Sequence, residues 1–332
     1  MRTAYEIGYS WIRADEKVYV DGDRISHLIW KSQMPVFIGG IDFRSTSGLT
    51  VDVRSRIGLF ATTRMDDYDW LSNKPQFRSF RFEEWTDYSH HEAVDVERYF
   101  DADLALGQDF NVGHAQRINL HGGLKYATIK FNCYGGRYIY SRNDFRDFTG
   151  SFPDMLGVTY EQRIPAAFIG ASWAGEFAQT LITIQARLGA TVGAQDADRH
   201  WRRQVIYSTD YNNARFVQIR GEVHHQLSPQ ATMFAAAQFE RFDEMAGNFW
   251  VTDLQENFTT QSHGTGGAAL KNLETGALGI WQTTHAEEPL LRENGLSLRL
   301  PRPCPHLSPI CRIDSRTPLP HDPALVRKSW SG

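Results

Sequence analysis

Long apolar runs, a cysteine framework and an excess of positive charge are all missing from this sequence. No stretch approaches the roughly 18 to 20 apolar residues that a membrane-spanning helix needs. The three cysteines, Cys133, Cys304 and Cys311, lack CxxC spacing, so they indicate neither a disulfide framework nor a zinc site. A net charge of −4 over 332 residues gives no sign of a nucleic-acid partner. No helical periodicity is present either, which argues against a helical protein.

An alternation of apolar and polar residues runs through most of the chain. In 49–61 and 180–192 nearly every second side chain is apolar, and arginines, acids and threonines lie between them. This period of two predicts strands with one apolar and one charged face. A soluble β-sandwich also alternates, but its strands are usually about 5 to 6 residues long. The longer stretches here favour a membrane barrel with lipid outside and a charged lumen inside, and the aromatic content of 13% suits its interfacial girdles.

Ten strands of this kind can be placed along the chain. The connections alternate between short turns and long polar loops near 67–95, 134–155, 197–205 and 243–264, which is typical of outer-membrane barrels. The fold predicted for 1–281 is therefore all-β: a ten-stranded antiparallel transmembrane β-barrel that extends above the outer membrane. The predicted strands are 4–19, 26–43, 48–65, 96–110, 115–132, 156–171, 176–195, 205–226, 231–243 and 265–281.

The two ends of the chain differ from the alternating part. Eight of the 13 prolines fall in 289–323, so 282–332 is predicted to be an irregular or disordered tail. A periplasmic extension and an out-of-frame translation are both compatible with that composition. At the start, Met1 leads directly into alternating sequence without an apolar segment, and we therefore expect no secretory signal in the sequence as given.

Two acidic clusters carry the candidate chemistry. Asp196, Asp198 and His200 stand at every second position, so they share one face if this stretch is extended. A carboxylate that orients an imidazole and stabilises its charged form is the minimum equipment of a general base. Asp67 and Asp69 form a second acidic pair far upstream. The alternative is that such short clusters are solvated loop ends, because patterns this short often match by chance.

The predicted topology brings both clusters to one rim of the barrel. The first, third and seventh strands run in the same direction, and their distal ends carry Glu16, 67–69 and 196–200. Strict alternation would point both clusters outwards, since they have the same parity as the lipid-facing residues of their strands. We therefore expect a bulge or a loss of regular strand within 61–67, and another within 192–196.

Several longer motifs stand in a fixed order along roughly residues 5–243. They are E-K-V-Y at 16–19, M-D-D-Y-D-W at 65–70, W-T-D-Y-S-H-H at 85–91, G-G-R-Y-I-Y-S at 135–141, F-R-D at 145–147, G-S-F-P at 150–153 and D-A-D-R-H at 196–200. In these motifs the chain resembles the omptins, the outer-membrane β-barrel proteases of Gram-negative bacteria. Several long matches in order are far more specific than any single triplet.

The resemblance implies an endopeptidase site. Asp198 and His200 match the Asp–His dyad of omptins, and Asp67 and Asp69 match the acidic pair across the cleft. The attacking water would lie between the two pairs. His200 would act as the base, with Asp198 orienting and supporting it.

The resemblance also implies a pocket for a basic side chain. Glu16 and Asp196 match the acids that select the residue before the cut, which predicts cleavage at Arg, Lys and dibasic sites. Met65 and Val158 match apolar positions beside the cleft. Ser89 matches a serine that affects activity without being the nucleophile. For Met65 and Ser89 a purely structural role is the alternative.

The partners implied by the resemblance are peptide or protein substrates with basic residues and the lipid of the outer membrane. We expect a monomer whose active site faces the extracellular side, without a metal or other cofactor. Lipopolysaccharide is a possible activator, and Arg163 is the residue that matches its binding patch. Residues 124–128 read L-K-Y-A-T and lack most of that patch.

Two other functions remain open. The facing DxD and DxH patterns also resemble a carboxylate–histidine metal site, so a metallohydrolase is possible. Sensitivity to a chelator separates the two hydrolases. A barrel that only binds, as an adhesin or a structural protein, is the alternative outside the enzymes.

Overall fold

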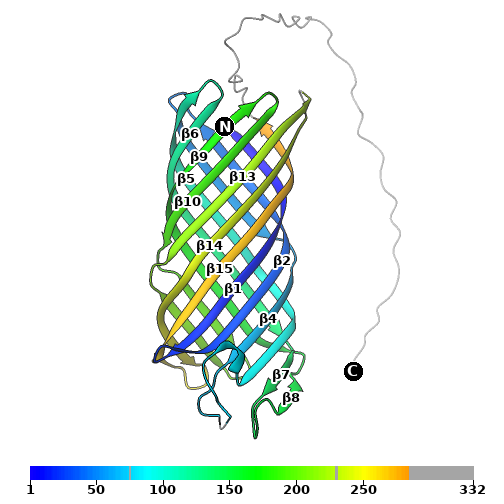
Figure 1. The fold of residues 1–332 in the computed structure, drawn as a ribbon, viewed down its shortest axis with the longest axis vertical. Coiled ribbons are helices and arrows are strands. Elements are labelled where there is room, and N and C mark those ends of the chain that lie inside the picture. Colours follow the sequence, from blue (N-terminus) through cyan, green and yellow to red (C-terminus); the bar gives the residue numbers. More distant parts are fainter. Residues whose placement is uncertain (75, 229–230, 284–332) are drawn as a thin grey trace, which may run out of the picture. The chain divides into compact units, whose positions relative to one another are not determined.

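The computed structural model describes residues 1–74, 76–228 and 231–283, and these fold into an antiparallel β-barrel (Figure 1). Over this part of the chain, fifteen strand segments form one sheet. They are β1 (Arg2–Val20), β2 (Asp23–Arg44), β3 (Leu49–Gly58), β4 (Thr62–Asp69), β5 (Asp87–Gly113), β6 (Gln116–Tyr134), β7 (Arg137–Tyr140), β8 (Phe148–Ser151), β9 (Leu156–Phe177), β10 (Thr180–Thr191), β11 (Gln195–His200), β12 (Val205–Tyr211), β13 (Arg215–Ser228), β14 (Ala231–Asp253) and β15 (Phe258–Thr283).

One short helical turn, η1 (Phe82–Glu84), interrupts the connection between β4 and β5. Among the described residues, no helix has both the length and the apolar content to cross a membrane.

The sheet closes on itself between its first and last strands. β1 pairs with β15 in antiparallel register from Arg2–Thr283 to Tyr19–Thr265, so no strand edge of the ring stays open. Within the described residues the ring has the ten predicted strand positions, because β3 with β4, β10 with β11, and β13 with β12 each share one position. The hairpin of β7 and β8 extends β5 at the end where β4 and β11 finish. We call that end the site rim, and Figure 1 shows β7 and β8 there, opposite the end with the N-terminus.

An apolar band covers the outer wall of the barrel. Large apolar side chains such as Ile7, Leu124, Ile169 and Leu188 are more than half exposed on that wall. Their neighbours along each strand point inwards, and the Lys125 side chain is fully buried. Burying such a band in lipid removes apolar area from water, which stabilises the membrane-inserted barrel. The alternation predicted from the sequence is thus confirmed.

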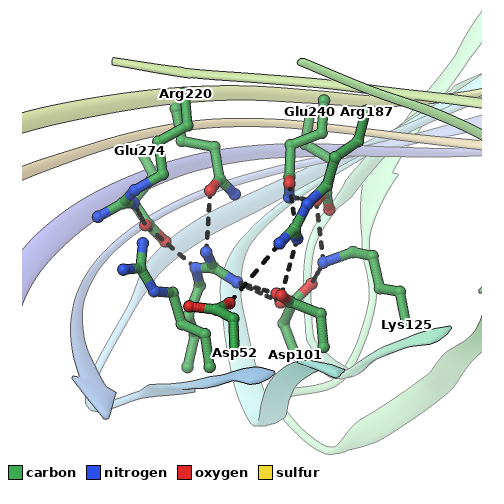
Figure 2. Close-up of polar contacts among 12 residues, drawn as sticks. Asp52, Asp101, Lys125, Arg187, Arg220, Glu240 and Glu274 are labelled. Atoms are coloured by element: carbon green, nitrogen blue, oxygen red, sulfur yellow. Dashed lines mark hydrogen bonds and ion pairs between the residues drawn. The ribbon is translucent and has the colours of Figure 1, made fainter. Parts of the chain in front are cut away.

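Paired charges fill the lumen inside that band (Figure 2). Arg56 donates from Nη1 to Asp101 Oδ1 at 2.6 Å and from Nε to Glu274 Oε1 at 3.1 Å. The Lys125 Nζ atom lies 2.9 Å from Glu240 Oε2 and also bonds to Asp101. These buried charges are therefore compensated by side chains of opposite charge, which form a polar core inside the barrel.

Both predicted interruptions of the alternation are present. β3 ends at Gly58 and β4 begins at Thr62, and the register of β4 against β5 shifts between Thr63 and Met65. Residues 192–194 separate β10 from β11 in the same way. The interruptions change the phase of the strands above the membrane, so the acidic clusters turn towards the barrel interior.

The strands at the site rim are longer than the sequence pattern predicted. The predicted loop 197–205 is wrong, because β11 and β12 form a hairpin joined by the four-residue turn 201–204. The predicted loop 243–264 is also mostly strand, since only 254–257 separates β14 from β15. β5 likewise begins well before residue 96. Above the apolar band both faces of a strand meet polar surroundings, so the hydrogen-bonded ladder continues after the alternation has faded.

The predicted tail 282–332 lies outside the described residues from 284 onwards, as do Cys304 and Cys311. Cys133, on β6, is buried and free.

We predict that Arg56→Ala destabilises the barrel by about 3 to 5 kcal/mol, because it removes the cation that the buried carboxylates of Asp101 and Glu274 share. The loss is measured by unfolding the purified protein in detergent. The fraction that still runs as the folded barrel in a denaturing gel is the readout. Arg215→Ala is the matched control. Arg215 bonds to Asp243 at 2.8 Å, but its side chain is 86% exposed, so its removal should change little. Equal effects of the two substitutions would contradict the packed-lumen interpretation.

Candidate active site

Three of the predicted site residues lie in one row of directly paired residues that runs across four neighbouring strands. Glu16 on β1 pairs with Leu28 on β2, Leu28 pairs with Asp67 on β4, and Asp67 pairs with Ser89 on β5. Directly paired residues of an antiparallel ladder share a face of the sheet. The side chains of Glu16, Asp67 and Ser89 therefore project into the barrel at one level.

β11 supplies the second cluster from the other side of the ring. Asp196 and Asp198 are 7% and 2% exposed and lie on its inward face, as the alternation predicts. β9 pairs alongside, with Tyr160 opposite Asp198 and Val158 opposite His200. The predicted dyad and the apolar position Val158 are thus neighbours.

A short hydrogen bond joins the dyad. His200 Nε2 lies 2.6 Å from Asp198 Oδ2, and the imidazole edge meets the Tyr207 ring at a centroid distance of 5.1 Å. With the Nε2 proton directed at the carboxylate, Nδ1 keeps a lone pair that can accept a proton. Asp198 Oδ1 is buried and has no hydrogen-bond partner among the described residues. The pair is therefore oriented as a general base needs.

The two clusters act on each other across the barrel. Burial, and then the charges of Asp69 and Asp198, raise the pKa of Asp67 well above its usual range. Burial raises the pKa of Asp69 to about 6, against a hydrogen bond from Ser26 that lowers it. The charge of His200 also lowers the pKa of Asp69. The charge of Asp198 thus acts on Asp67, and that of His200 on Asp69, so the acidic pair lies within electrostatic reach of the dyad.

A cleft of about 370 Å³ opens beside this group of residues. Its lining includes five of the predicted site residues, Met65, Asp67, Ser89, Val158 and His200. Both predicted apolar positions thus border the space in which Asp67 and His200 meet.

Two further acids, Glu16 and Asp196, are buried near the dyad, and among the described residues neither forms an ion pair with a cation. Glu16 is 5% exposed, and within the described residues its Oε2 has no hydrogen-bond partner. Burial, followed by the charges of Asp198 and Asp196, raises the pKa of Glu16 well above its usual range. Asp196 accepts hydrogen bonds from the hydroxyls of Tyr160, at 3.0 Å, and Tyr211. Burial nevertheless raises its pKa to about 7. Such carboxylates favour a positively charged side chain.

Aromatic rings separate the site from the charged lumen. Trp30 stacks on Phe131 at a centroid distance of 4.8 Å and on Tyr160 at 5.6 Å, and all three rings are fully buried. The Tyr160 hydroxyl also bonds to Asp196, so the same aromatic layer packs the barrel and positions an acid of the site.

The cleft-lining residues that sequence reasoning missed include His91, Tyr140, Phe152 and Arg203. His91 Nε2 lies 3.0 Å from Ser89 Oγ, and its ring stacks on Phe152 at 5.4 Å. Ser89 therefore has a partner other than His200. His91, Tyr140 and Phe152 stand inside motifs that had already been identified, but no chemical pattern marked them, and Arg203 lies in a turn without any motif.

The other predicted residue, Arg163, lies away from the site. It is on β9 with its side chain about half exposed, and its guanidinium bonds to Glu161 at 2.9 Å and 3.0 Å. Lys125, in the segment 124–128, points into the lumen instead and is not available to a lipid outside. In the described part of the chain, no three histidine, cysteine or carboxylate side chains converge as a metal ion would require.

Known proteins resemble this chain in sequence and in fold. The sequence profile of the Omptin family matches residues 1–281. The plasminogen activator of Yersinia pestis is 26% identical over 237 residues, which span 70% of this chain and 72% of that protein. The outer membrane protease OmpP of Escherichia coli (strain K12) is 25% identical over 267 residues, which span 78% of this chain and 82% of that protein.

Among solved structures, the outer membrane protease OmpT from Escherichia coli matches with a TM-score of 0.73 at 20% sequence identity. The match covers 85% of this chain and 97% of that chain. At this identity the likeness bears on the fold.

We predict that an arginine-containing ligand binds more tightly as the pH rises through about 7, because Asp196 must lose its proton before it attracts the cation. Binding near neutral pH should release protons, which calorimetry in buffers of different ionisation enthalpy measures.

The pH dependence of folding stability has the opposite sign to that of binding. A carboxyl whose pKa is raised in the folded state stabilises the fold at low pH and loses that contribution as the pH rises through the folded pKa. Asp196→Asn should flatten the pH dependence of binding, and an unchanged profile in that variant would contradict the assignment.

Proposed function

Because the chain belongs to the omptin family of outer-membrane proteases, we propose that it is an endopeptidase that cleaves peptides and proteins after arginine or lysine. The observation that carries the proposal is the Asp198–His200 hydrogen bond facing Asp67 across one cleft. The proposed nucleophile is water, since in the described part of the chain the dyad has no serine beside it: Ser89, which carries the one hydroxyl among the predicted residues, is hydrogen-bonded to His91 and not to His200.

The proposed reaction is a hydrolysis in which His200 takes a proton from water. The water oxygen attacks the carbonyl carbon, and the imidazolium formed is stabilised by Asp198. The proton then passes to the leaving amine as the carbon–nitrogen bond breaks. Because the pKa of Asp67 is raised, the Asp67–Asp69 pair retains a proton that it can donate as a hydrogen bond to the carbonyl oxygen as negative charge develops there.

Glu16 and Asp196 supply the proposed selectivity. Both are buried, and their carboxylates repel each other in the absence of a cation. An arginine or lysine side chain would relieve that repulsion and bond to both. Met65 and Val158, which border the cleft, would contact the substrate near the bond that is cut.

We further propose that the site faces the extracellular side. The connections at the site rim include the long segment 70–86 and the hairpin of β7 and β8, whereas the opposite end has short turns such as 45–48 and 178–179. Outer-membrane barrels carry their longer loops outside the cell. The protein would act as a monomer, with lipopolysaccharide at the outer wall near Arg163 as a possible activator.

The main test is a fluorogenic peptide with arginine before the scissile bond, incubated with the folded barrel with and without lipopolysaccharide. Cleavage after arginine, identified by mass spectrometry, is expected. A chelator should leave the rate unchanged, because the proposed water is held by side chains alone. Inhibition by the chelator would favour the metallohydrolase, and a folded barrel that cuts no basic peptide would favour the binding-only alternative.

We predict that His200→Ala and Asp198→Asn each lower kcat/KM by about a hundredfold to ten-thousandfold, the usual contribution of a positioned base. Resistance of the barrel to denaturation in gels should stay unchanged, which separates lost chemistry from lost folding. Arg199→Gln is the control from the same strand, since Arg199 is exposed on the outer face of β11. Activity of His200→Ala close to that of the unmodified protein would exclude the dyad.

A further inference from the structure

The acids at the site rim fall into two groups that differ in their neighbours. The deep group consists of Glu16 and Asp196, and within the described residues neither forms an ion pair with a cation of the chain. The upper group consists of Asp69 and Asp87, which pair directly across β4 and β5. Asp67 belongs to neither group: it is level with Glu16 across the strands and two residues before Asp69 along β4.

A lysine compensates the upper group. Lys74, in the connection between β4 and β5, places Nζ 3.4 Å from Asp87 Oδ1 and donates to the Ser141 carbonyl oxygen at 2.8 Å. Asp87 is 4% exposed, so this is a largely buried ion pair rather than a solvated contact. The second bond, to the carbonyl oxygen of Ser141, ties the ammonium group to the segment that directly follows β7.

An arginine reaches the same group from the other side of the cleft. Arg203 is in the turn 201–204, and its amide donates to the His200 carbonyl oxygen at 3.1 Å. The turn is anchored by Trp201, whose amide donates to Gly157 O at 2.9 Å and whose indole donates to Thr159 Oγ1 at 2.7 Å. Arg203 lines the cleft together with Asp67 and His200. Its charge lowers the pKa of both Asp67 and Asp69, opposing their burial.

We propose that Lys74 and Arg203 are specificity-determining residues that supply positive charge to the side of the cleft which receives the residue after the cut. The protein therefore selects a basic residue before the scissile bond and a neutral residue after it. This inference rests on the proposed function and deepens it, and it departs from the dibasic preference expected from the sequence.

The direction of the effect follows from where the substrate must lie. A basic side chain bound between Glu16 and Asp196 would place the scissile bond at the dyad. The substrate residue after that bond would then lie towards Asp69 and Asp87. Lys74 and Arg203 already balance the charge there. A second basic side chain would have to displace one of them or meet like charge in a partly buried cleft, which is unfavourable.

The test compares two fluorogenic peptides that differ only in having alanine or arginine after the cleaved arginine. The folded barrel should cleave the Arg–Ala peptide with a kcat/KM at least about tenfold above that of the Arg–Arg peptide, since like charges in a partly desolvated site repel strongly. Arg203→Gln should shift this ratio towards the Arg–Arg peptide by about tenfold, and Lys74→Met should shift it in the same direction. A ratio cancels any general loss of activity.

Arg199→Gln is the matched control, because it removes one positive charge from the same hairpin but on the outer face. Its ratio should equal that of the unmodified protein. Preferred cleavage of the Arg–Arg peptide, with a ratio unaffected by Arg203→Gln, would overturn the inference while leaving the proposed function intact. Failure of the folded protein to cleave either peptide would overturn both.

Discussion

The site depends on a phase shift between the part of each strand that meets lipid and the part that stands above it. Lipid requires an apolar residue at every second position of the outer wall, and this fixes which parity faces inwards. Asp67 and Asp198 have the parity of the outer wall in their strands. The breaks at 59–61 and 192–194 release them from that constraint. Without these breaks the acids would point away from each other on opposite sides of the barrel.

The phase shift has an electrostatic consequence. It brings Asp67, Asp69, Asp196 and Asp198 to the barrel interior near Glu16, and burial together with neighbouring acidic charges raises the pKa of Glu16, Asp67, Asp69 and Asp196. The packing below the cleft resists that repulsion. Stacked aromatic rings pack beneath the site, and ion pairs between buried side chains stabilise the lumen. The barrel thus accumulates unfavourable charge at one end and compensates for it through a rigid interior, an arrangement common at functional sites.

The sequence predicted the barrel well because its signal repeats on every strand. Alternation at 49–61 and 180–192 was strong enough to predict the fold, and the conflict of parity at Asp67 and Asp198 predicted where the strands break. The same signal failed at the rim. Both faces of the upper part of β14 meet polar surroundings, so its residues do not alternate and were assigned to a loop, as was most of β11.

Individual residues of the cleft were predictable only where their type suggests chemistry. Carboxylates and a histidine at every second position drew attention to β11. Phe152 and Arg203 did not, because their importance comes from what the fold places beside them. The partner of Lys74 is likewise a consequence of packing, since 74 and 87 are brought together by a connection without regular structure over most of its length.

The filled lumen has a meaning for the cell as well as for the fold. Many barrels of similar construction enclose an aqueous channel. Here the inward side chains of the membrane-spanning part form ion pairs with one another. The stacked rings of Trp30, Phe131 and Tyr160 lie between these ion pairs and the cleft. The molecule therefore crosses the membrane without perforating it. A membrane that contains many copies of such a barrel would keep its permeability barrier intact.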